Sequence, residues 1–213
     1  MGEFPTAYPD IDSFVKSSFI GDYTQMSALA RSRKPFNNGI VEGIIEIMTP
    51  RAVLEQMAHE KEIITSAEYS SFDLLRRDRN LVRDLKLVPA RSPQTQIEYE
   101  QMQKDTFLNI VRGHYINCPS KMTLVREMFP SDLPTGVGQY VVWLGEDDIP
   151  DYQVAEFIAI VTSLSGFTLD DIILFERSRK TTTQFAKVAV PEYRHIHMWT
   201  REEMQLTRLE MIQ

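Results

Sequence analysis

A nearly continuous apolar run covers residues 139–145, with the sequence QYVVWLG. A run of this length and composition is typical of a β-strand whose two faces are both covered. A strand with one face in water would instead alternate apolar and polar side chains. The run therefore predicts a strand that packs against other elements on both sides.

The residues that follow this run continue as a helix and two further strands. Residues 152–164 carry apolar side chains at helical spacing, Asp151 can cap this helix, and Gly166 can end it. Residues 171–177 and 193–199 have the composition of strands, and we expect the second of them to pair antiparallel to the first. This half of the chain therefore predicts a small three-stranded sheet with one helix packed on a face.

The part of the chain before the apolar run is mostly helical by its pattern. Threonine or serine followed by proline is typical of a helix start, because proline suits the first helical position. Gly113 stands where the third of these helices would end. The helices expected on this basis cover residues 49–64, 70–87, 92–112 and 120–128, and Thr200–Glu203 forms a capping box for a C-terminal helix.

These patterns predict the α+β class, with a helical N-terminal half packed on a three-stranded sheet of βαββα order. Residues 49–213 form this domain. Residues 1–48 are predicted to be an extended arm, because prolines and turn residues interrupt them and residues 39–48 read as β-like. The arm is too apolar for a free linker. It either wraps its own domain or docks on a protein partner or a neighbouring copy.

The composition of the 213 residues limits the kinds of function to consider. The net charge of −7 argues against broad nucleic-acid binding, which needs clustered Lys and Arg. The single cysteine, Cys118, allows neither an intrachain disulfide nor a cysteine-based zinc site. No apolar run is long enough to span a membrane, and the N-terminus does not read as a signal peptide. We therefore expect an intracellular, cytoplasmic protein.

The most conspicuous pair of side chains is His195-x-His197, which lies in the last predicted strand. Side chains alternate along a strand, so both imidazoles lie on one face. Two histidines at this spacing can share a metal ion if a third ligand arrives, and the candidates are Glu176 and either Asp147 or Asp148. General acid–base or phosphoester chemistry is a second interpretation. We favour a third, in which the pair is hydrogen-bonded and structural.

A small-ligand site around the His-x-His strand remains an alternative to the structural interpretation. Its residues would be His195, His197, Glu176, Lys180, Arg179 and Trp143. In that site Lys180 or Arg179 would hold an anion. We assign no catalytic residue, no metal and no cofactor, because the chain contains none of the short motifs that mark nucleophilic, phosphate-binding or metalloprotease sites.

The order of several motifs resembles that of an uncharacterised family related to fungal N-acetylglucosamine-induced protein 1, which has relatives in large DNA viruses. The motifs are Pro134, Val141-Val142-Trp143, Phe175-Glu176, Lys180, and His195-x-His197 followed by Arg201. The resemblance covers about residues 70–203 and implies a shared fold but no particular activity. The chain departs from the family pattern at Arg177-Ser178, where an Asn-Pro pair is usual.

The sequence therefore favours a non-catalytic structural or interaction protein. The apolar arm and the virus-type relatives make a subunit of a larger assembly, such as a minor capsid-type component, the preferred form of this hypothesis. The alternative is a small-ligand-binding protein or metal-dependent enzyme with its site around the His-x-His strand.

Overall fold

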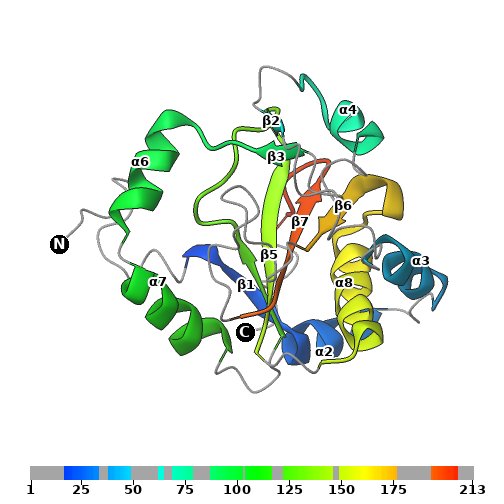
Figure 1. Cartoon of the computed structure of the whole chain (residues 1–213). Coiled ribbons are helices and arrows are strands. Elements are labelled where there is room, and N and C mark those ends of the chain that lie inside the picture. The colour runs from blue at the N-terminus through cyan, green and yellow to red at the C-terminus, as the bar shows by residue number, and fades with distance from the viewer. Residues whose placement is uncertain are drawn as a thin grey trace.

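The computed structural model describes residues 17–33, 38–48, 62–64, 69–78, 87–102, 104–116, 122–145, 149–176 and 193–205. These residues form a five-stranded sheet, a separate two-stranded sheet and the helices around them (Figure 1). The α+β class is therefore confirmed, and the main sheet has five strands where three were expected. Within these ranges, no helix is long and apolar enough to cross a membrane.

The strands of the main sheet are β1 (Phe19–Asp22), β4 (Met122–Arg126), β5 (Gly138–Leu144), β6 (Ile172–Phe175) and β7 (His195–Thr200). Their order across the sheet is β1-β4-β5-β7-β6, and all neighbouring strands are antiparallel. β5, β6 and β7 are the three strands expected from the sequence, and the antiparallel pairing of β6 with β7 is confirmed. β5 and β6 run parallel to each other, because both run opposite to β7 between them.

One face of the main sheet is covered by α8 (Asp151–Ser165), the helix expected between β5 and β6. Phe157 and Ile158 of α8 are fully buried against Val142 and Ile196 of the sheet. Gly166 ends the helix in a left-handed conformation, with φ of 75°, as the sequence predicts. This layer of helix on sheet forms the largest apolar core in the described residues.

The central strand β5 is buried on both faces, as its apolar run predicts. Tyr140, Val142 and Leu144 point into the core beneath α8. Val141 and Trp143 point to the opposite face and pack in a second apolar cluster. Both sets are at most 3% exposed, so packing on two sides explains why this strand lacks polar alternation.

The helix expected over residues 120–128 is a strand, β4, so that prediction is wrong. β4 pairs with β1 on one side and with β5 on the other, and its first four residues are buried. Thr123 and Val125 are β-branched and fit a pleated surface that is covered on both faces. The pairing with two neighbours overrides the short-range signal for a helix.

The expected extended arm is also wrong for the part of residues 1–48 that the structure describes. β1 is an edge strand of the main sheet, and α2 (Tyr23–Arg33) follows it directly. Met26 and Leu29 of α2 are 2% and 4% exposed and lie in the core with α8. Residues 1–16 lie outside the described residues, so the contacts expected of Phe4 and Phe14 stay predictions.

The isoleucine-rich residues 39–48 form a helix, α3 (Asn38–Met48), and not the β-like segment expected. Ile40, Ile44 and Ile47 recur at helical spacing and place one apolar stripe towards the core. Ile44 is fully buried in the cluster that contains α8. The strand preference of isoleucine therefore predicted the wrong structure for this segment, whereas the spacing of its apolar residues predicts the helix.

The helical half is shorter and more divided than the sequence predicts. Ile64 and Leu87, expected at the ends of two helices, lie in the parallel strands β2 (Glu62–Ile64) and β3 (Leu87–Pro89). Between these strands the structure describes α4 (Phe72–Arg77), which ends where the backbone N–H of the next residue bonds back to the helix. The helix start expected at Thr49-Pro50 lies outside the described residues.

The helix predicted over residues 92–112 is right in type but is interrupted. Ser92 caps α6 (Pro93–Gln101) by accepting a hydrogen bond from Thr95 N at 3.2 Å, as expected. The chain leaves the helical conformation at Met102 and resumes as α7 (Lys104–Ile110) and a π-helix, η2 (Val111–Ile116). The predicted stop at residue 113 falls inside η2, because the wider π turn continues the helix through it.

The C-terminal helix expected after β7 does not begin at its predicted capping box. Thr200 is the last residue of β7, and its hydroxyl donates to the carbonyl oxygen of Glu202 at 2.6 Å. Residues 201–205 are not helical, and residues 206–213 lie outside the described residues. Gly138 lies beside this corner, where a Cβ atom would meet the Glu202 carbonyl oxygen at 2.9 Å, so glycine allows the close approach.

Candidate functional site on the His-x-His strand

The two histidines of β7 share one face of the sheet, as the strand period predicts. Ile196 and Met198 point into the core beneath α8, and His195, His197 and Trp199 point to the opposite face. The face that carries the histidines is therefore the one turned away from α8.

An aromatic row surrounds the two imidazoles on this face. Trp143 of β5 lies opposite His195 in the strand register, with ring centroids 4.6 Å apart. Phe175 of β6 lies opposite His197 and stacks on it, with centroids 4.8 Å apart and planes 10° apart. The two imidazoles meet edge to face at 5.3 Å. The register of the three strands therefore packs the histidines between aromatic rings.

His195 is held by the residues that lead into β7. Its side chain is buried, and its Nδ1 lies 3.0 Å from the carbonyl oxygen of Tyr193. A carbonyl oxygen only accepts, so this contact requires that Nδ1 carries the proton and donates. The hydrogen bond fixes both the tautomer and the orientation of the ring beside Trp143.

His197 is held by Glu127, which follows β4. The His197 Nδ1 lies 3.3 Å from Glu127 Oε2, and the two side chains are 15% and 17% exposed. Glu127 is not among the site residues predicted from the sequence, because residues 120–128 were expected to form a helix. Once β4 is known to be a strand, every second residue from Thr123 lies on one face, which places Val125 and Glu127 on the same side. This period of two is the signal that would have identified Glu127 as a neighbour of the histidines.

The Glu127 carboxyl is kept ionised by its surroundings. Burial alone would raise the pKa of this carboxyl, but the hydrogen bond and charge of His197 lower it. The charge of Arg91 and the backbone N–H of Phe129 lower it further, and the pKa lies below its ordinary value of 4.5. Glu127 and His197 therefore form a charged or charge-assisted pair at neutral pH.

This depressed pKa makes the pair sensitive to acid. A carboxyl whose pKa is lower in the folded state contributes stability above its unfolded pKa, and that contribution is lost as the pH falls. We expect the free energy of unfolding to drop below pH 4.5 in the natural protein and to drop less in Glu127→Gln. Urea titrations between about pH 7 and about pH 3 measure both slopes, and equal slopes would rule out this role for Glu127.

Glu176, one of the candidate third ligands, lies on the other face of the sheet. It follows Phe175, so the alternation of β6 turns it towards α8. Its two oxygens bind Arg194 through Nε at 3.0 Å and Nη2 at 3.1 Å, a bidentate pair. Asp151, expected as a helix cap, also binds Arg194, at 2.7 Å, and Pro150 occupies the capping position.

The structure therefore brings together only part of the predicted ligand site. His195, His197 and Trp143 meet on one face, and Glu176 is separated from them by the sheet. Arg179, Lys180, Asp147 and Asp148 lie outside the described residues. Among the residues that the structure describes, no three His, Cys, Asp or Glu side chains form a group that could hold a metal ion.

A small cleft lies where Glu127 reaches the surface. The cleft is about 220 Å³ and is bordered by residues that precede β1, by the β4–β5 hairpin and by the segment after β7. Glu127, Arg126, Glu203, Met128, Pro130 and Val137 are among the residues that line it. We call this hollow the Glu127 cleft. Its polar wall is joined to the aromatic row through the contact of Glu127 with His197.

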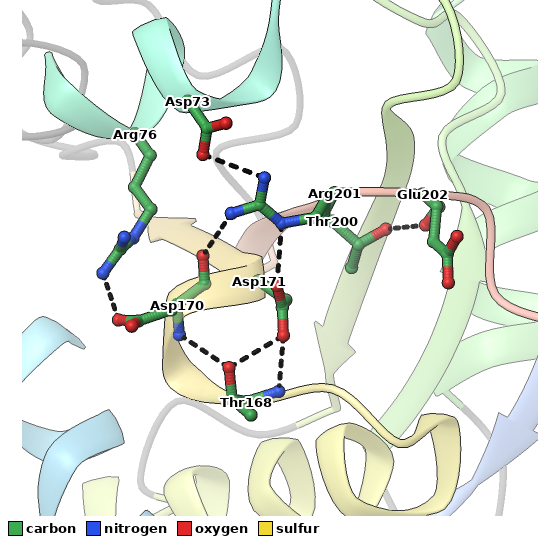
Figure 2. A network of polar contacts seen from close by, with 8 residues as sticks. All are labelled: Asp73, Arg76, Thr168, Asp170, Asp171, Thr200, Arg201 and Glu202. Atoms are coloured by element: carbon green, nitrogen blue, oxygen red, sulfur yellow. Dashed lines mark hydrogen bonds and ion pairs between the residues drawn. The ribbon is translucent and has the colours of Figure 1, made fainter.

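Arg201, the last residue of the family-like motif, joins three parts of the fold (Figure 2). Its guanidinium contacts Asp73 of α4 and Asp171 beside β6, both at 2.8 Å. The same group lies 5.1 Å from the ring centre of Phe72. Hydrogen bonds from Thr168, then the contact with Arg201, lower the pKa of Asp171. These contacts give Arg201 a structural role at the end of β7.

Replacing Arg201 by methionine is expected to lower stability by about 1 kcal/mol, because the ion pairs are partly exposed and screened by solvent. Arg77→Met is the matched control, since Arg77 is an exposed arginine that pairs with the adjacent Asp78. We expect this control to change stability little. Thermal or urea unfolding measures both variants, and an equal loss in the two would argue against a special role for Arg201.

Comparisons with known proteins add little to this geometry. No protein-family model matches the chain, and no curated protein matches it significantly. A solved structure described as the crystal structure of HTC1 is 13% identical, with a TM-score of 0.37, over 67% of this chain and 91% of that one. A likeness at this level carries no argument about function. The resemblance to the N-acetylglucosamine-induced family rests on sequence motifs.

Proposed function

We propose that this chain is a non-catalytic structural or interaction protein and a subunit of a larger assembly. The observation that supports this most is the way in which the candidate reactive groups bind one another. Glu127 binds His197, and Glu176 binds Arg194 on the other face of the sheet. Such pairs hold strands in place, so the His-x-His strand serves as a support for the fold.

The partner is a protein or a neighbouring copy of this chain, and the contact runs through the first residues of the sequence. Residues 1–16 include the large apolar side chains Phe4, Tyr8 and Phe14. Apolar segments of this kind gain stability when they bury those side chains on another surface. Within this proposal the protein is intracellular, and the virus-type relatives of the resembling family favour a minor capsid-type role in a virus particle.

Truncation of residues 1–16 tests the proposal. We expect the full chain to associate and the truncated chain to remain monomeric with an unchanged unfolding transition. Light scattering after size-exclusion chromatography measures the mass of each. A full-length variant with Phe4, Tyr8 and Phe14 replaced by serine tests whether these three side chains are responsible for the association. It should behave like the truncation. Undiminished association in both would refute the proposal. A longer truncation is unsuitable, because β1 and α2 belong to the core.

The alternative is a small-ligand-binding protein or metal-dependent enzyme with a site around the His-x-His strand. The observation in its favour is that His197 contacts Glu127, and Glu127 lines a cleft. In this alternative the sheet excludes Glu176 from the site, and Lys180 or Arg179 stays a candidate for holding an anion. Binding of an ion or ligand that is lost in His197→Ala would favour this alternative over the structural role.

A further inference from the structure

The Glu127 cleft has an uneven distribution of charge. Arg126 and Glu203 both line it, and they form an ion pair with 2.9 Å between Nη1 and Oε2. This pair neutralises itself at the rim, where the two side chains are 37% and 53% exposed. Glu127 is more deeply placed, at 17% exposed. Among the lining residues this leaves the carboxylate of Glu127, whose contact with His197 lies on the side of the aromatic row.

The carboxylate of Glu127 has acceptor capacity beyond its present contacts. An ionised carboxylate has about four lone-pair positions for hydrogen bonds. Oε2 lies 3.3 Å from His197 Nδ1, and Oε1 accepts from Phe129 N at 3.5 Å. Both distances are longer than the usual 2.7–2.9 Å or so of a charge-assisted hydrogen bond. Glu127 is thus oriented by the protein without being saturated by it.

The rest of the lining is mixed: Ser17, Ser18 and Gln139 are polar, and three hairpin residues form an apolar part of the wall. Met128, Pro130 and Val137 line it on the hairpin between β4 and β5. A ligand that matches these walls carries a short aliphatic part, and a ligand that matches Glu127 carries a positively charged donor group. The volume of about 220 Å³ admits only a small molecule.

We propose that the Glu127 cleft binds a short primary alkylammonium ion, with its ammonium group on the Glu127 carboxylate and its alkyl chain against the apolar wall. His197 acts as a positioning residue, because its Nδ1 contacts the Glu127 carboxylate from the side of the aromatic row. This inference goes beyond the assembly role and rests on different residues, those that line the Glu127 cleft.

The test is a titration with n-butylammonium chloride, followed by the backbone amide shifts of Phe129 and Gln139 in ¹⁵N–¹H spectra. We expect saturable shifts of both amides. Neither 1-butanol, which has the same alkyl chain without the charge, nor potassium chloride at equal ionic strength should produce them. Equal shifts with 1-butanol, or no saturable shifts with butylammonium, would overturn the proposal.

Two variants locate the binding group. In Glu127→Gln we expect the affinity for butylammonium to fall about tenfold or more, because an uncharged amide replaces the ionic acceptor. Glu42→Gln removes an equal charge from an exposed position on α3 and should leave the affinity unchanged. Unchanged affinity in Glu127→Gln would overturn the site. If that variant does not fold, the comparison of butylammonium with 1-butanol in the natural protein decides alone.

Discussion

Deleting residues 1–33 is expected to abolish the cooperative unfolding transition of the protein. The deletion removes β1 from the edge of the main sheet and all of α2. Met26 and Leu29 leave the core beneath α8, and the loss of one such side chain costs about 2–5 kcal/mol. The whole stability of a domain is about 5–15 kcal/mol, so this loss is comparable to the total.

Deletion of residues 1–16 is the matched control, because it leaves β1 and α2 in place. Circular dichroism during urea unfolding distinguishes the two truncations. We expect a sigmoidal transition for the shorter deletion and a broad, non-cooperative change for the longer one. A longer deletion that still unfolds cooperatively, with an unchanged midpoint, would mean that residues 17–33 are a dispensable arm after all.

Replacing His197 by phenylalanine is expected to destabilise the protein by about 3 kcal/mol. Phenylalanine keeps a ring beside Phe175 but removes the Nδ1 that binds Glu127. The carboxylate of Glu127 is then left mostly buried without its main partner. Chemical unfolding at neutral pH measures the loss, and His195→Phe is a useful comparison, because the hydrogen bond described for His195 is with a backbone carbonyl oxygen.

A second substitution separates the pair from the packing. Removing both partners in Glu127→Leu/His197→Phe is expected to recover most of the lost stability, because no orphaned charge remains. The coupling energy follows from the two single variants and the double variant. Strictly additive effects would show that Glu127 and His197 contribute independently, and the structural account of the pair would then be wrong.

The strands β5, β6 and β7 and the helix α8 were predictable because their signals are local. β5 is one apolar run, β7 alternates large residues, and Gly166 ends α8 where a left-handed residue is needed. In each case the residues that define the element lie within it. The pairing of β6 with β7 also followed from their closeness in the sequence.

The elements that escaped prediction depend on partners that are distant in the sequence. β4 is a strand because it pairs with β1 on one side and with β5 on the other. The sequence of residues 122–126 alone does not reveal these two partners. For α3 a strand was expected and a helix is found, because the strand preference of isoleucine was given more weight than the helical spacing of the apolar residues. Residues 17–48 looked like an arm because their packing surface, α8, follows them by more than a hundred residues.

The candidate site was predictable only where it depends on local sequence. The common face of His195 and His197 follows from the strand period alone. Their neighbours depend on register, which sets Trp143 opposite His195 and Phe175 opposite His197. Glu176 follows Phe175 directly, so the same alternation turns it away once the register is known. The sequence does not give that register.

Elemental analysis of the purified full-length protein distinguishes a structural pair of histidines from a metal site. We infer that His195 and His197 are structural, held by Tyr193 O and Glu127 among aromatic rings. We therefore expect no stoichiometric zinc, iron or manganese, and a metal content that is the same in the natural protein and in His195→Ala. Near-stoichiometric metal in the natural protein that disappears in His195→Ala would contradict the account and establish a metal site on the His-x-His strand.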